Sequence, residues 1–169
     1  MNRPPASGSR KDRGASAGRC GGQAPAKPAR VSRRACHQLA PLGEPQDRAI
    51  AAEIEAHIAE APRLVILGHE HPDGDCVGSC IALCACLRAQ RRRAEVVMAE
   101  PLPARYRFLH TAEYVRQEQP GCLVDAGLVL VLDATGLDRL GGLKLHRAHG
   151  SVIINIDHHV SNARFGTLN

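Results

Sequence analysis

Four short runs of mostly apolar residues constrain the fold of this chain more than any other feature. They lie at residues 64–67, 94–100, 127–133 and 151–157. Apolar and polar residues do not alternate within them, as they would in a strand with one face in water, which indicates strands buried on both faces. Segments with helical character separate the runs, an order typical of a parallel sheet. The sequence therefore predicts an α/β fold with a doubly wound, mainly parallel sheet flanked by helices.

The helices are predicted from apolar spacing and from composition. Residues 45–61 place Ile50, Ile54 and Ile58 four positions apart, which forms one apolar stripe with charged residues opposite. Residues 75–90 are apolar on most sides, so we expect this helix to be packed between other elements. Weaker helical segments are expected within 105–119 and 138–149.

The first 45 residues differ in composition from the rest of the chain. Residues 1–46 contain nine Lys or Arg and two acidic residues, whereas residues 47–169 contain thirteen basic and fifteen acidic residues. The segment 1–45 is rich in Pro, Gly, Ala, Ser and Arg and is expected to be a disordered leader, with a transit peptide or a nucleic-acid-binding arm as alternatives. The folded domain is expected over residues 46–169, and the high net charge is no evidence of a nucleic-acid-binding face on it.

The seven cysteines are interpreted as thiols in a reducing compartment. Cys76, Cys80, Cys84 and Cys86 fall among the apolar residues of one predicted helix, where Cys packs as a small apolar side chain. The odd number and the lack of an apolar signal segment predict a cytoplasmic protein, and no stretch approaches the roughly 20 apolar residues of a membrane span. As a metal site this stripe is a weak candidate, because paired Cys-x-x-Cys spacing is missing.

Clusters of polar residues follow three of the four apolar runs. Because ligands bind beyond the carboxyl ends of parallel strands, we expect the three clusters to converge at one edge of the sheet. Each cluster alone would suit an ordinary loop, turn or helix cap, but together they predict a metal centre. The clusters comprise His69, His71, Asp73 and Asp75 after the first run, Asp133 after the third, and Asp157, His158 and His159 after the fourth.

Carboxylates that converge at a strand edge need a counter-charge, because they repel one another and lose hydration. A pair of divalent cations removes both penalties. Ligands of His and carboxylate, without thiolate, suit Mn²⁺, Mg²⁺, Fe²⁺ or Co²⁺ better than a structural Zn²⁺. Two such ions about 3.5–4 Å apart activate water for in-line attack at phosphorus. The sequence lacks the GxxxxGK[ST], GxGxxG, HExxH and GxSxG motifs, which argues against nucleotide kinases, dehydrogenases, zinc proteases and serine hydrolases.

The loop after the first run is expected to be extended. Pro72 keeps His71 out of the helical region, and alternate positions of an extended segment project to one side. Asp75 is then expected where the next helix begins, as a cap or as a cation ligand. Gly78 and Ser79 are small enough to let the first turn approach a bound phosphate.

Three segments, GHEHPDGDCVGS, VLDATGLDRLG and IDHHVSNARFG, resemble in order the first three motifs of the DHH phosphoesterase family. The resemblance extends over residues 47–169 and is strongest to the branch of oligoribonucleases (nanoRNases) and 3′-phosphoadenosine-5′-phosphate phosphatases. The pyrophosphatase branch usually carries Thr in place of Gly74, and the exonuclease branch carries Asp in place of His69. The resemblance implies a hydrolase that cleaves short oligoribonucleotides or 3′-phosphoadenosine 5′-phosphate.

The resemblance also implies two bound divalent cations, Mn²⁺ in the first place, with Mg²⁺ or Co²⁺ as alternatives. It implies that His69 and Asp73 bind the first ion, that Asp75 and His158 bind the second, and that Asp133 bridges the two.

Catalytic roles and substrate contacts are implied in the same way. Asp157 is expected to orient its histidine neighbours, and His159 to contact the scissile phosphate or assist the leaving oxygen. Ser79 is a candidate neighbour of the substrate phosphate. His71 matches a variable position and is left outside the site.

The family's fourth motif, with a further metal-binding Asp, and its smaller C-terminal substrate domain do not occur in these 169 residues. We therefore expect an N-terminal catalytic-domain fragment with impaired turnover, and homodimer formation through the sheet edge that truncation exposes. The alternatives are an inorganic pyrophosphatase or cyclic-dinucleotide phosphodiesterase of the same superfamily, or a non-catalytic metal- or nucleotide-binding fragment.

Overall fold

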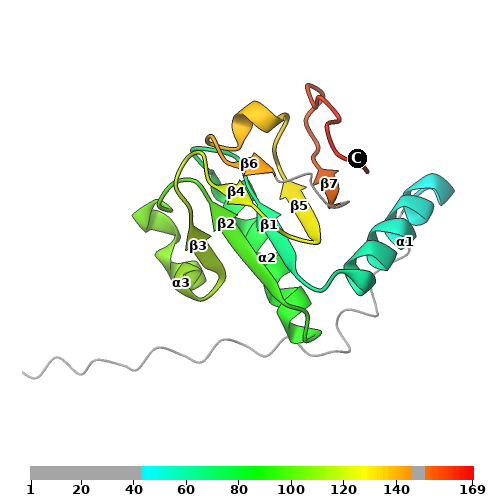
Figure 1. Ribbon diagram of the computed structural model, residues 1–169, viewed down its shortest axis with the longest axis horizontal. Coiled ribbons are helices and arrows are strands. Elements are labelled where there is room, and N and C mark those ends of the chain that lie inside the picture. Colours follow the sequence, from blue (N-terminus) through cyan, green and yellow to red (C-terminus); the bar gives the residue numbers. More distant parts are fainter. Residues whose placement is uncertain (1–42, 146–150) are drawn as a thin grey trace, which may run out of the picture. The chain divides into compact units, whose positions relative to one another are not determined.

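The computed structural model describes residues 43–145 and 151–169, and within them a five-stranded parallel sheet forms the centre of the fold (Figure 1). The strand order is β3-β2-β1-β5-β7, and every neighbouring pair is parallel. The predicted parallel α/β fold is confirmed, while nearly all of the expected leader lies outside the described residues. The strands are β1 (Leu64–Leu67), β2 (Ala94–Met98), β3 (Val115–Gln117), β5 (Leu128–Leu132) and β7 (Val152–Ile156).

Burial on both faces explains why the central strands are continuously apolar. All four residues of β1 are fully buried, and the five residues of β5 are buried as well. Leu64 and Ile66 belong to the apolar cluster on one face, whereas Val65 and Leu67 belong to the cluster on the other. Each strand therefore contributes to two cores, and a polar residue at any of these positions would lose its hydration.

The two long helices, α1 (Pro45–Glu60) and α2 (Gly74–Ala89), pack on the same face of the sheet. Ile54 and Ile58 of α1 lie against the cluster that contains the buried cysteines of α2. Arg92, just after α2, donates hydrogen bonds to the carbonyls of Ile58 and Ala61 and ties the ends of the helices together. The prediction that cysteines of α2 act as apolar core residues is confirmed for Cys76, Cys80 and Cys84.

The opposite face of the sheet is covered by two largely irregular segments, one before β5 and one after it. The first contains β4 (Leu123–Val124), the second contains the 3₁₀ turn η3 (Leu137–Arg139) and β6 (Lys144–Leu145), and β4 pairs with β6. Leu140 and Leu143 supply much of the apolar contact of the second segment with the sheet. The prediction of a helix over 138–149 is wrong for the described part of that range, to residue 145.

Two glycines explain why the second segment does not form a helix. Gly141 and Gly142 have positive φ angles of 61° and 79°, which lie outside the right-handed helical region. A Cβ atom on Gly141 would lie 2.6 Å from the Cβ of Ala99, so the close approach to β2 also requires glycine.

Residues 104–117 connect β2 to the edge of the sheet. They form the 3₁₀ helix η2 (Ala104–Leu109), the helical turn α3 (Thr111–Tyr114) and strand β3. The short helix expected here is present, but the edge strand was missed because three residues carry too little pattern. No helix in the described part of the chain has both the length and the apolar character that crossing a membrane requires.

The direction in which successive strands are added to the sheet reverses between β1 and β5, and such a switch point forms a crevice. The chain passes from β1 outward to β2 and β3, then crosses the sheet to β5 on the other side of β1 and continues outward to β7. Loops that leave the carboxyl ends of β1 and β5 therefore diverge to opposite sides. In open α/β sheets, ligands bind at this point.

Candidate metal centre

Asp133 occupies the centre of the predicted site, directly after β5. Its φ angle is +57°, a conformation that Asp adopts more readily than most residues but that still stores strain. Its backbone N–H donates a 3.0 Å hydrogen bond to the carbonyl of Ile156 at the end of β7. The residue is only 9% exposed, so its carboxylate is held in place at the switch point.

Three histidine rings face this carboxylate from two other strand ends. The His69 Nε2 atom lies 3.6 Å from Asp133 Oδ2, the His158 Nε2 atom 3.5 Å from Oδ1, and the His159 Nδ1 atom 3.6 Å from Oδ1. These separations are too long for good hydrogen bonds. The structure thus brings together the ends of β1, β5 and β7, as expected from the strand order.

Two further carboxylates surround the same point, from the start of α2. Asp73 Oδ1 lies 4.0 Å from His69 Nε2, and Asp75 Oδ2 lies 3.7 Å from His158 Nε2. Asp73, and not Asp75, is the N-cap of α2, since its Oδ1 accepts hydrogen bonds from the N–H groups of Asp75 and Cys76. The bond from Cys76 is the main reason why the pKa of Asp73 is lowered. Of the two roles expected for Asp75, the helix cap is therefore wrong, since the cap lies two residues earlier, and the role of cation ligand stays a prediction.

His71 turns away from these groups. Its φ angle is +52°, so the loop makes a tight turn and is not extended as the sequence suggested. Pro72 disfavours the right-handed helical region for the preceding residue, and His71 avoids that region with a positive φ angle instead of an extended conformation. The His71 ring is exposed and pairs with Glu100 at 2.9 Å.

The Asp133 carboxylate lacks a partner for one of its oxygens. Its Oδ1 atom is buried and has no hydrogen-bond partner in the part of the chain that the structure describes. Burial, followed by the negative charge of Asp75, raises the pKa of Asp133. A buried carboxylate oxygen without a hydrogen-bond partner is costly unless a cation neutralises its charge.

The surrounding donor atoms fit a divalent cation. Donor atoms of Asp133, His158 and His159 lie within 4.8 Å of one another, and so do those of Asp133, His69 and Cys76. Imidazole nitrogen and carboxylate oxygen suit Mn²⁺, Zn²⁺, Fe²⁺ and Co²⁺. Asp133 is therefore common to two groups of residues that could each hold a metal ion.

Asp157 supports the site through its contact with His159. Its side chain has no solvent exposure, and its Oδ1 atom lies 2.7 Å from Nδ1 of His159. Burial alone would raise the pKa of Asp157, but hydrogen bonds from His159 and Asn162 outweigh this and lower it. The same bond from Asp157 raises the pKa of His159.

Two asparagines connect this pair to the sheet, and sequence reasoning missed both. The Asn162 amide donates 2.7 Å hydrogen bonds to Asp157 Oδ2 and to Asn155 Oδ1. Asn155 is 2% exposed and donates to the carbonyls of Val131 and Ala134, around the end of β5. A single Asn within the apolar run VIINI was the available signal.

Ser79 belongs to α2, the helix that begins beside Asp73 and Asp75, and Tyr106 belongs to η2, which contacts α2. The Ser79 hydroxyl donates to the carbonyl of Cys76 inside α2, at 3.2 Å. Two atoms of the Tyr106 side chain lie 4.0 Å from the position that a Cβ on Gly74 would occupy. The guanidinium of Arg105 lies 4.8 Å from the centre of the Tyr106 ring. Tyr106 was not predicted as a site residue, although its position next to Arg105 in the sequence could have indicated a contact between the two side chains.

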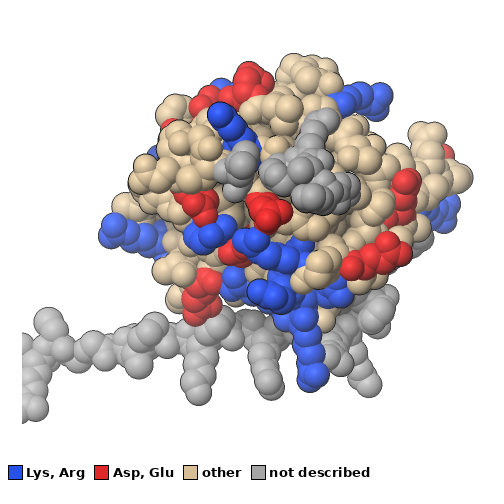
Figure 2. All heavy atoms as spheres, viewed as in Figure 1, with Lys and Arg blue, Asp and Glu red and all other residues tan. Residues whose placement is uncertain are grey.

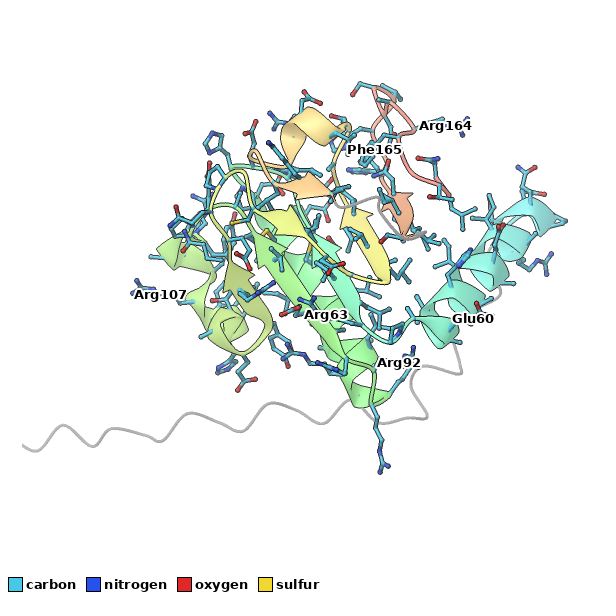
Figure 3. All side chains as sticks on the ribbon, viewed as in Figure 1. Glu60, Arg63, Arg92, Arg107, Arg164 and Phe165 are labelled. Atoms are coloured by element: carbon cyan, nitrogen blue, oxygen red, sulfur yellow. The ribbon has the colours of Figure 1, made fainter. Side chains whose placement is uncertain are left out.

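Arginines near the amino ends of β1 and β2 make contacts within the fold, and basic side chains gather on the face drawn in Figure 2. Arg63 precedes β1 (Figure 3). It pairs with Glu95 and donates to the carbonyl of Asp125. Arg88 donates to the carbonyls of Ala94 and Glu113. A cavity of about 230 Å³ near these strand ends is lined by Arg63, Arg88, Arg93, Ala94 and Glu95.

Comparison with known proteins agrees with the fold and the three motifs. Residues 63–168 match the DHH family, N-terminal domain. Over 122 residues the chain is 36% identical to the bifunctional oligoribonuclease and PAP phosphatase NrnA of Thermus thermophilus, and the match covers 72% of this chain and 34% of that protein. The crystal structure of an exopolyphosphatase-related protein from Bacteroides fragilis matches with a TM-score of 0.59 and 21% identity, over 72% of this chain and 38% of that one. The chain thus spans about a third of the length of the curated relative it matches.

Proposed function

The chain belongs to the DHH family, and from this membership we propose that it is a metal-dependent phosphoester hydrolase. The observation that carries the proposal is the convergence of histidine and carboxylate groups from β1, α2, β5 and β7 around the buried Asp133 carboxylate. Donors of different kinds at the ends of strands, around a buried carboxylate with one oxygen that has no hydrogen-bond partner among the described residues, are characteristic of a catalytic metal centre.

We propose that Asp133 is shared by two divalent cations, with Mn²⁺ as the first candidate. His69 and Asp73 would hold one ion, and Asp75 and His158 the other. When bound, the ions supply charge neutralisation at the phosphoryl oxygens and Lewis-acid activation of water.

The residues around the ions would then hold and move protons. Asp157 would accept a hydrogen bond from His159 Nδ1–H and so fix the orientation of that ring, which leaves Nε2 to meet the substrate. In the metal-free chain, the hydrogen bond to Asp157 raises the pKa of His159 and so favours the protonated ring. A protonated Nε2 can donate to a phosphate oxygen or to the leaving oxygen, which is the role we propose for it.

Short oligoribonucleotides and 3′-phosphoadenosine 5′-phosphate are the substrates we propose, because a relative at 36% identity is named for both activities. The position of Tyr106 beside Gly74 supports a nucleotide, since aromatic faces stack on bases. Ser79 remains a proposed neighbour of the phosphate. Inorganic pyrophosphate and cyclic dinucleotides are the competing substrates, and a panel of all four classes would separate them.

Calorimetric titration of the whole chain with Mn²⁺ is the experiment that tests the metal centre. Asp133→Asn removes the shared charge while keeping a residue that tolerates positive φ, which Asp133→Ala would not. We expect the parent chain to bind Mn²⁺ and Asp133→Asn to lose that binding. Glu53→Gln, an exposed carboxylate on α1, is the matched control and should bind like the parent.

The outcomes separate the candidate functions. Binding together with release of nucleoside monophosphate from a dinucleotide supports the hydrolase. Binding without turnover of any substrate in the panel would support a metal- or nucleotide-binding module instead. Equal Mn²⁺ binding by the parent and by Asp133→Asn would reject the centre.

We also propose a cytoplasmic location, since Cys76, Cys80 and Cys84 are not in disulfides. Neither edge strand of the described sheet favours homodimer formation through an open edge. Residues Thr167 and Leu168 pair with β7 along its outer side, and β3 is short and carries the charged Arg116. Sedimentation velocity tests this: a monomer at all concentrations would contradict the homodimer, and a concentration-dependent dimer would support it.

A further inference from the structure

The first cysteine of α2 lies at the metal centre and not only in the core. Cys76 is fully buried, and its Sγ atom lies within 4.8 Å of both a ring nitrogen of His69 and a carboxylate oxygen of Asp133. Sequence reasoning placed Cys76 with Cys80 and Cys84 as an apolar stripe and described the ligand set as free of thiolate. Cys76 belongs to the same core cluster as Cys80 and Cys84, but among these three cysteines only Cys76 is grouped with His69 and Asp133.

Gly68 is the reason why the sulfur can reach this position. It is the residue between β1 and His69, and a Cβ atom built on it would lie 2.3 Å from Cys76 Sγ. No side chain other than hydrogen leaves room for the sulfur there. The first turn of α2 therefore packs its thiol directly against the end of β1, beside the His69 ring.

The Asp133 carboxylate adds a second observation. Asp133 is more than nine-tenths buried, its Oδ2 atom lies 3.6 Å from His69 Nε2, and its Oδ1 atom, on the side of His158 and His159, has no hydrogen-bond partner among the described residues. An anionic oxygen, an imidazole nitrogen and a sulfur thus surround one point from three elements. Together they form a mixed O, N and S donor set of the kind that holds a thiophilic divalent ion.

We propose that Cys76 is a thiolate ligand to the ion held by His69 and Asp133, an inference that rests on the proposed function. This half of the centre then selects Zn²⁺ or Co²⁺, whereas the half built from Asp75 and His158 has only oxygen and imidazole donors and takes Mn²⁺. On binding, the Cys76 thiol loses its proton to solvent and forms one sulfur–metal bond, so one proton is released per ion. The two halves of the centre therefore differ in metal preference.

Titration of the whole chain with Co²⁺, followed by absorption spectroscopy, tests this without any assay of activity. Thiolate ligation adds a sulfur-to-cobalt charge-transfer band in the near ultraviolet, and the visible d–d bands report Co²⁺ bound by any ligands. The parent chain should show both features, and Cys76→Ser should keep the d–d bands and lose the charge-transfer band. Cys84→Ser, which alters a buried thiol farther along α2, is the matched control and should keep both.

The outcomes distinguish this inference from the proposed function. A parent chain with d–d bands but no charge-transfer band would overturn the role of Cys76 and leave the metal centre standing. A parent chain without either feature would overturn both. Cys76→Ala serves as a second variant if Cys76→Ser does not give the parent's circular dichroism spectrum. A charge-transfer band that persists in a folded Cys76 variant would assign the ligation to another thiol and reject the inference.

Discussion

Asp133 combines three properties at the scale of a single residue: burial, a positive φ angle and an oxygen without a hydrogen-bond partner among the described residues. Each of these lowers the stability of the metal-free fold, and none of them helps β5 to pack. Backbone strain and a buried carboxylate oxygen without a hydrogen-bond partner are typical of functional positions, because the rest of the fold is stable enough to tolerate them. The residue is better explained by what it binds than by what it stabilises.

Replacement of Asp133 by Asn is expected to stabilise the metal-free chain at neutral pH. The folded-state pKa of Asp133 is raised, so ionisation costs stability above that pKa, and the cost disappears as the pH falls through it and below the ordinary value. The gain should be on the order of 1 kcal/mol. Urea unfolding in EDTA measures it, and the difference between variant and parent should vanish on acidification. A loss of stability at neutral pH would contradict this account.

The pair of Asp157 and His159 gives a second prediction at this scale. The raised pKa of His159 depends on Asp157, so Asp157→Asn should lower it toward the ordinary histidine value near 6.5. Stability from the pair is fully present below that ordinary value and is lost as the pH rises through the folded pKa. Histidine NMR titration of the metal-free chain measures the change. Asp138→Asn, an exposed carboxylate in η3, should leave the titration of His159 as it is in the parent.

At the scale of elements, the contact between the end of β1 and the first turn of α2 decides how closely helix and sheet approach. Gly68 permits this contact, whereas a Cβ atom added to Gly78, within α2, would meet no other atom within 4 Å. The two glycines therefore have different roles. The first is required by packing, and the second only lowers the stability of the helix.

Alanine substitutions should show this difference. Gly68→Ala is expected to destabilise the chain by about 1–3 kcal/mol, because its Cβ would overlap Cys76 Sγ and press on Met98. Gly78→Ala should stabilise it by about 0.5–1 kcal/mol. Denaturant unfolding of both variants and of Gly68→Ala with Cys76→Ala gives the coupling, and the double variant should recover part of the loss. Equal effects at the two glycines would refute the packing argument.

The helix–sheet arrangement could be predicted from sequence because its signals are local. Continuous burial of β1 and β5 leaves an unbroken apolar run, and the order of strands and helices then places the polar clusters at one edge. The turn at His71, the path around Gly141 and the position of Cys76 could not be predicted in this way. Each depends on a contact with a distant segment: His71 with Glu100, Gly141 with Ala99, and Cys76 with Asp133.

At the scale of the whole molecule, the stability of the fold should depend on metal. The carboxylates of Asp73, Asp75 and Asp133 surround one point, and a bound cation removes their repulsion only in the folded chain. Mn²⁺ at about 100 times its dissociation constant should add about 2.7 kcal/mol, which corresponds to a rise of several degrees in Tm. Thermal unfolding with Mn²⁺ and then with excess EDTA measures the rise and its reversal. A similar rise for Asp133→Asn would show that the ion binds elsewhere.

The position of the centre at the switch point also has a consequence for synthesis. Its donors are drawn from the loop after β1 and from the residues after β7, so the nascent chain cannot complete the set until β7 has emerged and docked beside β5. We therefore expect an ion to bind at this centre only after β7 has joined the other strands of the described sheet.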